Sequence, residues 1–358
     1  MRIFHLLPGN SPLIVGNYIT FVKEECETIH HTHVFACISS GQSLPSEVMS
    51  VGLQPLSYEQ TFNEMKKAEK TILHSLFFSY RIDLFLLKNP RILKRVFVLA
   101  WGGDIYVDSK VYKGIKPQIA WLIRKAFLRN VRHFIGLFPP DIDYYRKRYN
   151  RKVKSFWAIY SDAVRNPIYN RANIVYDETE NNPSVDPVKI LVGHSSVSSL
   201  NHIFILENIQ AYKDNNIRVI LPLSYGNSEY GDQVERKAKE CLGSKAVALR
   251  QLIPFEEYIN MLDTVDVAIF HTYRQIALGN IYPLMYLGKK LYMPRGSVMY
   301  EYFTSVGIEI GDSNKIGMMD YNELIKPISA KAGYDYVKKY IADLDWVKSQ
   351  WEIVFDYC

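Results

Sequence analysis

The chain has 358 residues, a formal net charge of +6, 48% hydrophobic residues and 22% charged residues. This composition is that of an ordinary globular protein and excludes a disordered or low-complexity chain. The length exceeds what one hydrophobic core usually serves, so two domains are expected.

The four cysteines, at positions 26, 37, 241 and 358, are scattered along the chain. They form no CxxC pair, so neither a zinc site nor a disulfide framework is predicted, and a reduced, cytosolic compartment fits them. The apolar run of the first ten residues is cut by Pro8 and Gly9, so no signal peptide is expected. No stretch of 18 apolar residues occurs, so no membrane-spanning helix is predicted.

The first half of the chain alternates between strand-like and helix-like runs. Six apolar runs are expected to be strands: residues 1–7, 33–39, 71–78, 95–103, 131–138 and 153–160. Helical patterns lie between many of them. This alternation is typical of a parallel sheet covered by helices.

Positive charge is concentrated in residues 110–154. Thirteen lysines and arginines stand there against two acids, Asp141 and Asp143, which is more net positive charge than the whole chain carries. Residues 119–138 read IAWLIRKAFLRNVRHFIGLF, with Trp, Leu and Phe at helical spacing between basic residues. This pattern fits two structures, a helix on an anionic membrane surface or a core helix with a solvated basic face. Nucleic acid ranks last, because no nucleic-acid-binding module is recognisable.

The composition changes at residues 175–189, which are acidic, rich in Asn and Pro and poor in apolar residues. These features are typical of a linker. Strands and helices then alternate again. Five strands are expected at residues 189–194, 217–225, 246–253, 266–271 and 290–295, and helices at 201–213, 230–242, 254–265 and 279–289. This half is predicted to be a doubly wound α/β domain.

Ligands of such a sheet bind beyond the carboxyl ends of its strands. The strand ends of the second half carry small, hydroxyl-bearing or basic residues: Gly193, His194, Ser195, Ser196, Ser224, Tyr225, Arg274, Gln275, Gly279 and Asn280. Backbone N–H groups at a helix start, serine hydroxyls and a guanidinium suit a diphosphate. The alternative for the serines is a helix cap, which needs only one hydroxyl. His202, one turn further, is expected to pack or cap.

Four segments carry a resemblance to a known family: VGHSSVSSLNH, LPLSYGN, LRQLIPFEEYINMLDTVDVAIFHTYRQIALGNIYPLMYLGKKLYM and, in the first half, VLAWGGDIY. In this order and spacing they resemble the 4-acetamido-4,6-dideoxygalactosyl (Fuc4NAc) transferases, which build enterobacterial common antigen on an undecaprenyl carrier. The match covers most of residues 95–305. It is weak over residues 1–70, and the C-terminal tail matches little.

The resemblance implies an α/β enzyme of the GT-B type, in which two Rossmann-like domains face each other across a cleft. We expect an N-terminal acceptor domain at 1–165, a linker at 166–188 and a nucleotide-sugar domain at 189–332. An amphipathic helix at 333–358 either closes back on the first domain or packs as an ordinary helix. The implied partners are a dTDP-sugar donor, a lipid-pyrophosphate-linked saccharide acceptor and the cytoplasmic face of the bacterial inner membrane.

The resemblance also gives the basic segment a role, in which Arg124, Lys125, Arg129 and Arg132 hold anionic lipid or meet the acceptor's pyrophosphate. The nucleobase is expected on the loop after the strand at 246–253, against Leu252, Ile253 and Phe255, with Ser224 and Tyr225 nearby. No cofactor and no metal are expected, because GT-B enzymes generally use basic side chains and helix dipoles at the diphosphate.

An inverting transfer needs a general base to deprotonate the acceptor hydroxyl. Asp104, which follows a buried strand and two glycines, is the first candidate, with a turn cap as the alternative. His74 is the second, with a hydrogen-bonded core histidine as its alternative. Asp141 and Asp143 spell DxD, the metal–diphosphate signature of another glycosyltransferase fold, but here we interpret them as local charge balance among basic neighbours.

Three other functions remain open from the sequence. One is a GT-B transferase with another nucleotide-sugar and another glycan acceptor. A second is a UDP-sugar epimerase of the same architecture, which needs paired acids and no lipid acceptor. A third is a non-catalytic binding module, which would tend to lose the set of Arg274, Gly279 and Ser195 that this sequence retains.

Overall fold

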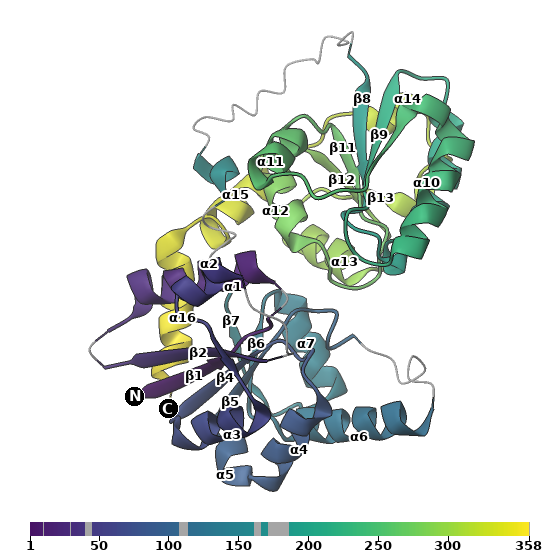
Figure 1. Cartoon of the computed structure of the whole chain (residues 1–358). Helices are drawn as coiled ribbons and strands as arrows, with labels where there is room; N and C mark the ends of the chain where they lie inside the picture. Colours follow the sequence, from purple (N-terminus) through teal and green to yellow (C-terminus); the bar gives the residue numbers. More distant parts are fainter. Residues whose placement is uncertain are drawn as a thin grey trace. The chain divides into compact units, whose positions relative to one another are not determined.

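The computed structural model describes residues 1–9, 11–28, 30–39, 45–106, 114–160, 166–170 and 186–357. The chain divides into two compact units: Met1–Val164 with Asp343–Cys358, and Arg165–Ala342. Each unit is a parallel sheet with helices packed on it (Figure 1). The predicted α/β class is confirmed.

The first unit is built on a seven-stranded parallel sheet, counted over the described residues, in the order β3-β2-β1-β4-β5-β6-β7. The strands are β1 (Arg2–Leu6), β2 (Thr32–Ile38), β3 (Gln54–Leu56), β4 (Lys70–His74), β5 (Val96–Ala100), β6 (His133–Gly136) and β7 (Lys154–Trp157). All six predicted strands are present, and β3 is an addition. The strand order reverses between β1 and β4, where such sheets place their ligands.

The helices of the first unit lie on both faces of its sheet. They are α1 (Pro12–Phe21), α2 (Ser46–Ser50), α3 (Tyr58–Lys67), α4 (Tyr80–Lys88), α5 (Pro90–Leu93), α6 (Ile115–Asn130), α7 (Pro139–Arg148) and α16 (Leu344–Asp356), with a π-helical turn η1 (Val22–Cys26). Figure 1 shows α1 and α16 on one face and α3, α4 and α6 on the other. Trp351 of α16 is fully buried against Tyr18 of α1, with ring centroids 4.9 Å apart.

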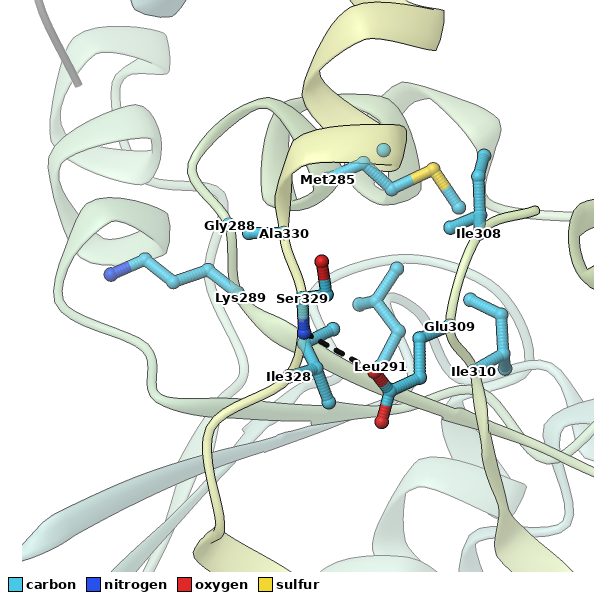
Figure 2. A pocket seen from close by; sticks show the side chains of 11 residues that line it. Met285, Gly288, Lys289, Leu291, Ile308, Glu309, Ile310, Ile328, Ser329 and Ala330 are labelled. Atoms are coloured by element: carbon cyan, nitrogen blue, oxygen red, sulfur yellow. Dashed lines mark hydrogen bonds between the residues drawn. The ribbon is translucent and has the colours of Figure 1, made fainter. Parts of the chain in front are cut away.

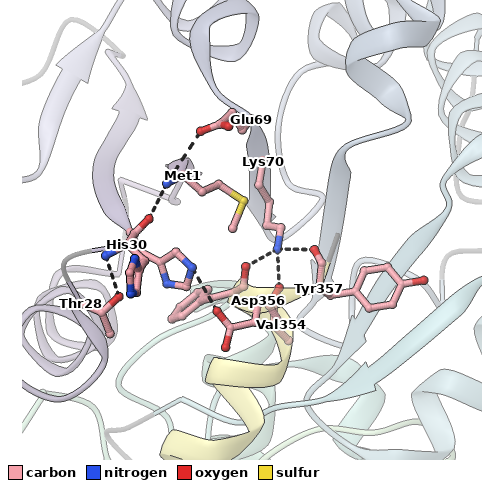
Figure 3. A network of polar contacts seen from close by, with 10 residues as sticks. Met1, Thr28, His30, Glu69, Lys70, Val354, Asp356 and Tyr357 are labelled. Atoms are coloured by element: carbon pink, nitrogen blue, oxygen red, sulfur yellow. Dashed lines mark hydrogen bonds and ion pairs between the residues drawn. The ribbon is translucent and has the colours of Figure 1, made fainter.

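A buried lysine fastens the end of α16 to the sheet. The Nζ of Lys70, on β4, donates to the carbonyl oxygens of Val354 at 2.7 Å, Phe355 at 2.5 Å and Tyr357 at 2.8 Å (Figure 3). The last carbonyls of a helix have no intrahelical partner and carry partial negative charge, so one ammonium group satisfies two of them together with the carbonyl of Tyr357, the residue after the helix.

The second unit is built on a six-stranded parallel sheet within the described residues, in the order β10-β9-β8-β11-β12-β13. The strands are β8 (Val188–Val192), β9 (Ile217–Pro222), β10 (Ala246–Leu249), β11 (Val267–Ile269), β12 (Lys290–Met293) and β13 (Gly311–Asp312). The five predicted strands are present, with β13 in addition. The strand order reverses between β8 and β11, which makes this the expected ligand edge.

The helices of the second unit connect these strands. They are α9 (His202–Ile209), α10 (Ser228–Leu242), α11 (Phe255–Asp263), α12 (Leu278–Tyr286), α13 (Val298–Ser305), α14 (Tyr321–Ile325) and α15 (Lys331–Tyr340), with short 3₁₀ turns η3 (Pro167–Asn170), η4 (Ser198–Leu200), η5 (Gln210–Tyr212), η6 (Gly243–Lys245) and η7 (Ser313–Lys315). The four predicted helices correspond to α9, α10, α11 and α12.

The predicted linker and tail divide differently from the expected boundaries. Most of the linker, residues 171–185, lies outside the described residues. Residues 166–170 pack within the second unit, where the Tyr286 hydroxyl donates to the Tyr169 carbonyl at 3.1 Å. The tail at 333–358 is split, since α15 belongs to the second unit and α16 to the first.

Candidate active site

The loop after β8 is shaped by a glycine and a histidine. Gly193 has a φ of +68°, and a Cβ there would stand 2.4 Å from Nε2 of His202. His202 is fully buried at the start of α9, and its backbone N–H donates to the Tyr230 hydroxyl at 3.2 Å. The His202 ring therefore packs against the loop after β8, and the absence of a side chain at Gly193 leaves room for this ring.

The two serines that follow are buried and have different partners. Ser196 donates from Oγ to the Leu223 carbonyl at 2.9 Å, and its N–H donates to the Tyr225 carbonyl at 2.7 Å. Ser196 thus joins the loops after β8 and β9 rather than presenting its hydroxyl to a ligand. Ser195, also fully buried, has its Oγ 3.4 Å from Nε2 of His194.

The loops after β8 and β11 meet at Arg274. Its Nη2 donates to Ser199 Oγ at 3.2 Å and its Nη1 to the Gln275 carbonyl at 3.3 Å. The pKa of His194 is lowered to about 3, first by burial and then by the charges of His202 and Arg274. His194 is therefore a neutral ring beside a cation, at the point where the strand order reverses.

Several buried polar atoms at this edge have no hydrogen-bond partner among the described residues. They are His194 Nδ1, Thr272 Oγ1 and Gln275 Oε1. A buried polar atom without a partner costs free energy, about 1–3 kcal/mol in mutational data, and native proteins usually satisfy such atoms with solvent or a ligand. These atoms mark the edge between β8 and β11 as one where a polar ligand gains contacts.

The start of α12 provides an open helix N-terminus at the same edge. Ala277, before its first residue, is left-handed with a φ of +63°, and a Cβ built on Gly279 would meet no atom within 4 Å. The side chain of Asn280 is hydrogen-bonded to Tyr258 of α11. Gly279 therefore keeps the approach to this end clear, as a backbone–phosphate contact requires.

The expected nucleobase residues lie on the loops after β9 and β10. Leu252 is 77% exposed, Phe255 46% and Tyr225 52%, while Ser224 and Ile253 are half-buried. Apolar and aromatic side chains left exposed at a ligand edge offer a surface on which a planar base can stack.

A small cavity elsewhere in the second unit does not belong to this edge (Figure 2). It has a volume of about 10 Å³, lies between Met285, Leu291, Ile308 and Ala330, and holds the contact in which Ser329 N–H donates to Glu309 at 3.2 Å. Lys289 and Glu309, which come just before β12 and β13, also line the cavity, so it lies at the amino ends of these strands. Its size suits about one water molecule.

In the first unit Asp104 stands at the carboxyl end of β5. It is 6% exposed, and its two oxygens accept hydrogen bonds from the N–H groups of Leu76 at 2.8 Å and Trp101 at 2.9 Å. Burial raises the pKa of Asp104 to about 6, while these bonds oppose the rise. The carboxylate thus holds the turns after β4 and β5 together, and at neutral pH it is mainly ionised.

His74 is the middle of a buried hydrogen-bonded row. Its Nδ1 lies 2.9 Å from the Tyr160 hydroxyl and its Nε2 lies 3.1 Å from His5 Nδ1. His5 Nε2 lies 2.9 Å from His33 Nδ1 in turn, and Trp101 Nε1 donates to Tyr160 at 3.1 Å. Both nitrogens of His74 are engaged and its side chain is fully buried. The alternative of a hydrogen-bonded core histidine therefore describes its position.

The predicted basic contact residues, three on α6 and Arg132 just after it, fall into two groups. Arg124 points inward, with Nε donating to Asp83 at 2.5 Å and Nη2 to the Phe78 carbonyl at 2.7 Å, and Nη1 donating to the Leu76 carbonyl. This placement corrects the expectation that Arg124 faces lipid or acceptor. Lys125 is half-buried with its Nζ 4.7 Å above the Trp121 ring, and Arg129 and Arg132 are exposed.

An apolar stripe on α6 stands in solvent. Ile115 is 79% exposed, Ile119 51% and Leu122 57%, and their spacing places them on one side of the helix; we call them the α6 stripe. The 16 residues of α6 include no acid. In contrast Phe127 and Leu128, read from the sequence as part of the same apolar pattern, are buried in the core.

Sequence reasoning missed two features of the first unit. Asp141, interpreted as local charge balance, is in fact fully buried in the first turn of α7, and Tyr106 donates to it at 2.7 Å. The row of His5, His33 and His74 was also missed. In the sheet His5 lies opposite Phe35 of β2 and Ile72 of β4. His33 and His74 are each two residues away from these partners, so all three histidines point to the same face.

Within the parts of the chain that the structure describes, no helix is long and apolar enough to cross a membrane. Over the same residues, no group of three or more His, Cys, Asp or Glu side chains is placed to hold a metal ion.

Comparison with known proteins agrees with the resemblance drawn from the sequence. Residues 2–308 match the sequence model of a family described as 4-alpha-L-fucosyltransferase, glycosyl transferase group 56. The match spans parts of both compact units and includes every residue of the edge between β8 and β11 that is named above.

Solved structures with the same fold cover almost the whole chain. A glycosyltransferase from Rickettsia africae ESF-5 has 14% identity and a TM-score of 0.64, covering 99% of each chain. A structure described as trehalose-6-phosphate from E. coli bound with UDP-2-fluoro glucose has 10% identity and a TM-score of 0.63, covering 100% of each. A putative UDP-N-acetylglucosamine 2-epimerase from Listeria monocytogenes has 10% identity and a TM-score of 0.55, covering 99% of this chain and 94% of that one. These likenesses confirm the GT-B fold.

Proposed function

We propose that this chain, which belongs to glycosyl transferase group 56, the 4-alpha-L-fucosyltransferase family, transfers a Fuc4NAc residue from a dTDP-sugar to a saccharide on a polyprenyl pyrophosphate. The chain is a glycosyltransferase of the GT-B type. The family description names a fucosyl group, a 6-deoxyhexose as Fuc4NAc is. It therefore also favours a second candidate, in which an L-fucosyl nucleotide is the donor.

The observation that carries the donor half is the edge between β8 and β11. A cation, Arg274, is held there by Ser199 beside three buried polar atoms, all without a partner among the residues described. In the proposed complex the diphosphate lies against Arg274 and the N-terminus of α12, at Gly279 and Asn280. Their positive charge stabilises the diphosphate as it departs from the sugar, which is where negative charge develops in the transition state.

Within the same proposal the remaining edge residues hold the rest of the nucleotide. The β8 loop, with Gly193, His194 and Ser195, lines the phosphates. Ser196 acts by joining this loop to the next, and Gln275 supplies a buried polar contact. The base and ribose lie on the exposed surface made by Ser224, Tyr225, Leu252, Ile253 and Phe255.

For the acceptor half we propose Asp104 as the general base. Its carboxylate lies in the turn after the carboxyl end of β5, where ligands of such sheets bind, and retains lone pairs beyond those that accept backbone N–H bonds. A pKa of about 6, caused by burial, leaves it ionised at pH 7 yet more basic than an ordinary carboxylate. His74 is not used, because both of its nitrogens are engaged.

For the partner surface we propose that the α6 stripe docks on an anionic membrane, at the cytoplasmic face of the bacterial inner membrane. An exposed apolar side on a helix without acids, flanked by Lys116, Lys125 and Arg129, matches the chemistry of an interfacial helix. Each basic residue near anionic lipid adds about 1 kcal/mol of attraction. Docking of this kind places the enzyme beside a lipid-linked acceptor.

Thermal shift with dTDP, UDP, GDP and CDP tests the donor assignment. At a hundredfold excess over its Kd the right nucleotide stabilises the protein by about 2.7 kcal/mol. We expect dTDP to give the largest shift, with and without EDTA. In Arg274→Ala we expect dTDP affinity to fall at least tenfold, because a charge-assisted contact to phosphate is lost.

Other outcomes separate the candidates. A larger shift with GDP favours the fucosyl nucleotide, and one with UDP favours another GT-B donor or the epimerase. If none of the four nucleotides shifts the melting temperature, the assignment of the β8–β11 edge as a donor site is wrong. Lys315→Ala, an exposed basic position on η7, is the matched control and should bind dTDP as the parent does.

A further inference from the structure

Asp141 is a buried carboxyl group that the proposed reaction has not used. It lies in the first turn of α7, immediately after β6, and is fully buried. Its Oδ1 accepts a hydrogen bond from the Tyr106 hydroxyl at 2.7 Å, while its Oδ2 meets no donor among the described residues. A carboxylate is rarely kept in this state, because burial without full pairing opposes ionisation. Asp143, two residues away, is exposed.

The partner of Asp141 belongs to the turn that carries Asp104. This turn is closed by two hydrogen bonds to the Gly102 carbonyl, from Ile105 N–H at 3.0 Å and Tyr106 N–H at 3.3 Å. Within this turn Asp104 accepts from the N–H groups of Leu76 and Trp101, whereas Tyr106 donates to Asp141. The bond from Tyr106 to Asp141 therefore fixes α7 to the loop of the proposed base.

A second contact strengthens this connection. The hydroxyl of Tyr149, which follows α7, donates to the Ile105 carbonyl at 2.9 Å, and the Tyr106 ring packs on Tyr144 with centroids 4.3 Å apart. The turn is thus held by α7 at both ends of the helix. Little freedom remains for the position of the Asp104 carboxylate relative to α7.

The two carboxyl groups also influence each other electrostatically. Burial raises the pKa of Asp141 to about 7, the Tyr106 hydrogen bond opposes this rise, and the charge of Asp104 adds to it. Burial raises the pKa of Asp104 to about 6. Between these pH values the pair holds about one proton, and by reciprocity the charge of Asp141, once formed, increases the proton affinity of Asp104.

We propose that Asp141 is a positioning residue for the transfer reaction, which acts through Asp104 by holding the Asp104 turn through its hydrogen bond with Tyr106 and by attaching a second carboxyl group to that turn. This inference rests on the proposed role of Asp104. In that step the acceptor hydroxyl proton passes to Asp104 as its oxygen bonds to the anomeric carbon. The bond from that carbon to the diphosphate breaks, and its electron pair leaves with the diphosphate.

The pH dependence of kcat/KM tests the proposal. In the parent we expect a rise in two steps, near pH 6 as Asp104 ionises and near pH 7 as the Asp141 charge makes Asp104 a stronger base. Asp141→Asn should keep the lower step and lose the upper one, with kcat/KM above pH 7.5 about three- to tenfold lower. Tyr106→Phe should move the upper step to higher pH, because it removes the bond that favours the charged Asp141.

The matched control is Asp143→Asn, the same change at the exposed carboxylate of the same helix, and it should follow the parent profile. If Asp141→Asn keeps both steps and only lowers the melting temperature, Asp141 is a packing residue and the proposal is wrong. If Asp141→Asn fails to fold, the shift expected in Tyr106→Phe decides in the same way, and an unchanged profile overturns the proposal.

A measurement without turnover separates this inference from the proposed function. Carbon-13 NMR titration of the side-chain carboxyls in the unliganded protein should show Asp104 and Asp141 titrating as a coupled pair, and Asp104 should titrate in one step in Asp141→Asn. Independent titration of the two groups overturns the inference even in an active enzyme. Coupled titration in a protein that transfers no sugar supports the pair and shows instead that the proposed function is wrong.

Discussion

At the residue scale, two glycines of the second unit serve opposite purposes. Gly193 is needed by the fold, since its φ of +68° and the ring of His202, 2.4 Å from where a Cβ would stand, both exclude a side chain. Gly279 is not needed by the fold, because a Cβ there meets nothing within 4 Å. If Gly279 has a requirement, it comes from a ligand.

This contrast gives a matched pair of alanine variants. Gly193→Ala should lose about 2–4 kcal/mol of unfolding free energy, from left-handed strain and displacement of a buried ring. Gly279→Ala should change stability by about 0.5 kcal/mol or less, yet weaken dTDP binding about tenfold by blocking the backbone of α12. Urea unfolding and dTDP titration measure the two effects, and unchanged binding in Gly279→Ala would remove α12 from the donor site.

Residue positions were predictable where a polar side chain follows a buried strand. Asp104 and Arg274 lie after β5 and β11, as the sequence indicated, because residues after parallel strands collect at one edge of the sheet. Their roles in binding and catalysis stay predictions. Asp141 was misjudged because its basic sequence neighbours suggested solvent. The structure instead brings it against Tyr106, 35 positions away, which no local pattern reveals. Ser196 was given a ligand role although its hydroxyl is used inside the protein.

At the element scale, the face of the first sheet under α1 and α16 contains the buried histidine row. Burial lowers the pKa of His74 to about 3, and burial followed by the charge of His31 lowers that of His33 to about 4. The pKa of His5 is also lowered, first by burial. In each case the folded protein favours the neutral ring. Protonation of the same histidines in the unfolded chain therefore lowers the free energy of unfolding.

The sign of the pH dependence follows from these depressed values. Stability is complete above the unfolded pKa of about 6.5 and is lost as pH falls below it, by up to about 1.4 kcal/mol per pH unit for each histidine. Asp104 and Asp141, whose pKa values are raised by burial, act in the opposite direction over pH 4–7. The His74→Gln variant should therefore take up about one proton fewer on unfolding between pH 4.5 and 6, so its unfolding free energy should change less steeply with pH.

Urea unfolding at several pH values measures this slope. His30→Gln, at an exposed position outside the row, is the control and should keep the parent slope. An unchanged slope in His74→Gln would mean that His74 is protonated in the folded protein, contrary to its burial.

The α6 helix allows a direct test of membrane docking. Leu122→Glu puts a charge in the middle of the α6 stripe, where the side chain is 57% exposed, so folding should be retained. Binding to vesicles of anionic phospholipid should fall at least tenfold, from lost apolar burial and added repulsion. Glu59→Gln, an exposed position on α3, should bind as the parent does. Equal vesicle binding by parent and Leu122→Glu would exclude the α6 stripe as the docking surface.

Strand prediction failed at sheet edges. The strands β3 and β13 have three and two residues, and β3 contains Pro55, so neither produces an alternating pattern that a sequence can show. The central strands were all found because each contains a run of buried apolar residues.

At the scale of the whole molecule, the two units build their sheets in the same order of strands. Each sheet starts with an inner strand, adds two more strands on one side and then adds the remaining strands on the other side. Alternation predicted a parallel sheet with helices in each unit, but it does not determine this strand order. The division of the tail between α15 and α16 was not predictable either, because both helices have similar amphipathic patterns and only their packing distinguishes them.

Closure of the first unit by α16 predicts a large effect of its lysine cap. Lys70→Met should destabilise the first unit by about 2–4 kcal/mol, because it leaves three carbonyls at the end of α16, two in the helix and one at Tyr357 after it, without this donor. Hydrogen exchange followed by mass spectrometry should show faster exchange in β1, β2 and α16, with the second unit unchanged. Lys66→Met, at an exposed lysine of α3, is the control, and equal exchange in both variants would show that the cap contributes little.

The position of α16 has a consequence for synthesis of the protein. The strands of the first unit leave the ribosome before Arg165, but the helix that covers His5 and Tyr18 is made only after the whole of Arg165–Ala342. At about 5–20 residues per second, this interval lasts roughly 10–35 s. For that time the nascent first unit lacks its own helix on one face of its sheet. A molecular chaperone that shields apolar surface should therefore be recruited to the early half of the chain and leave only after α16 has emerged.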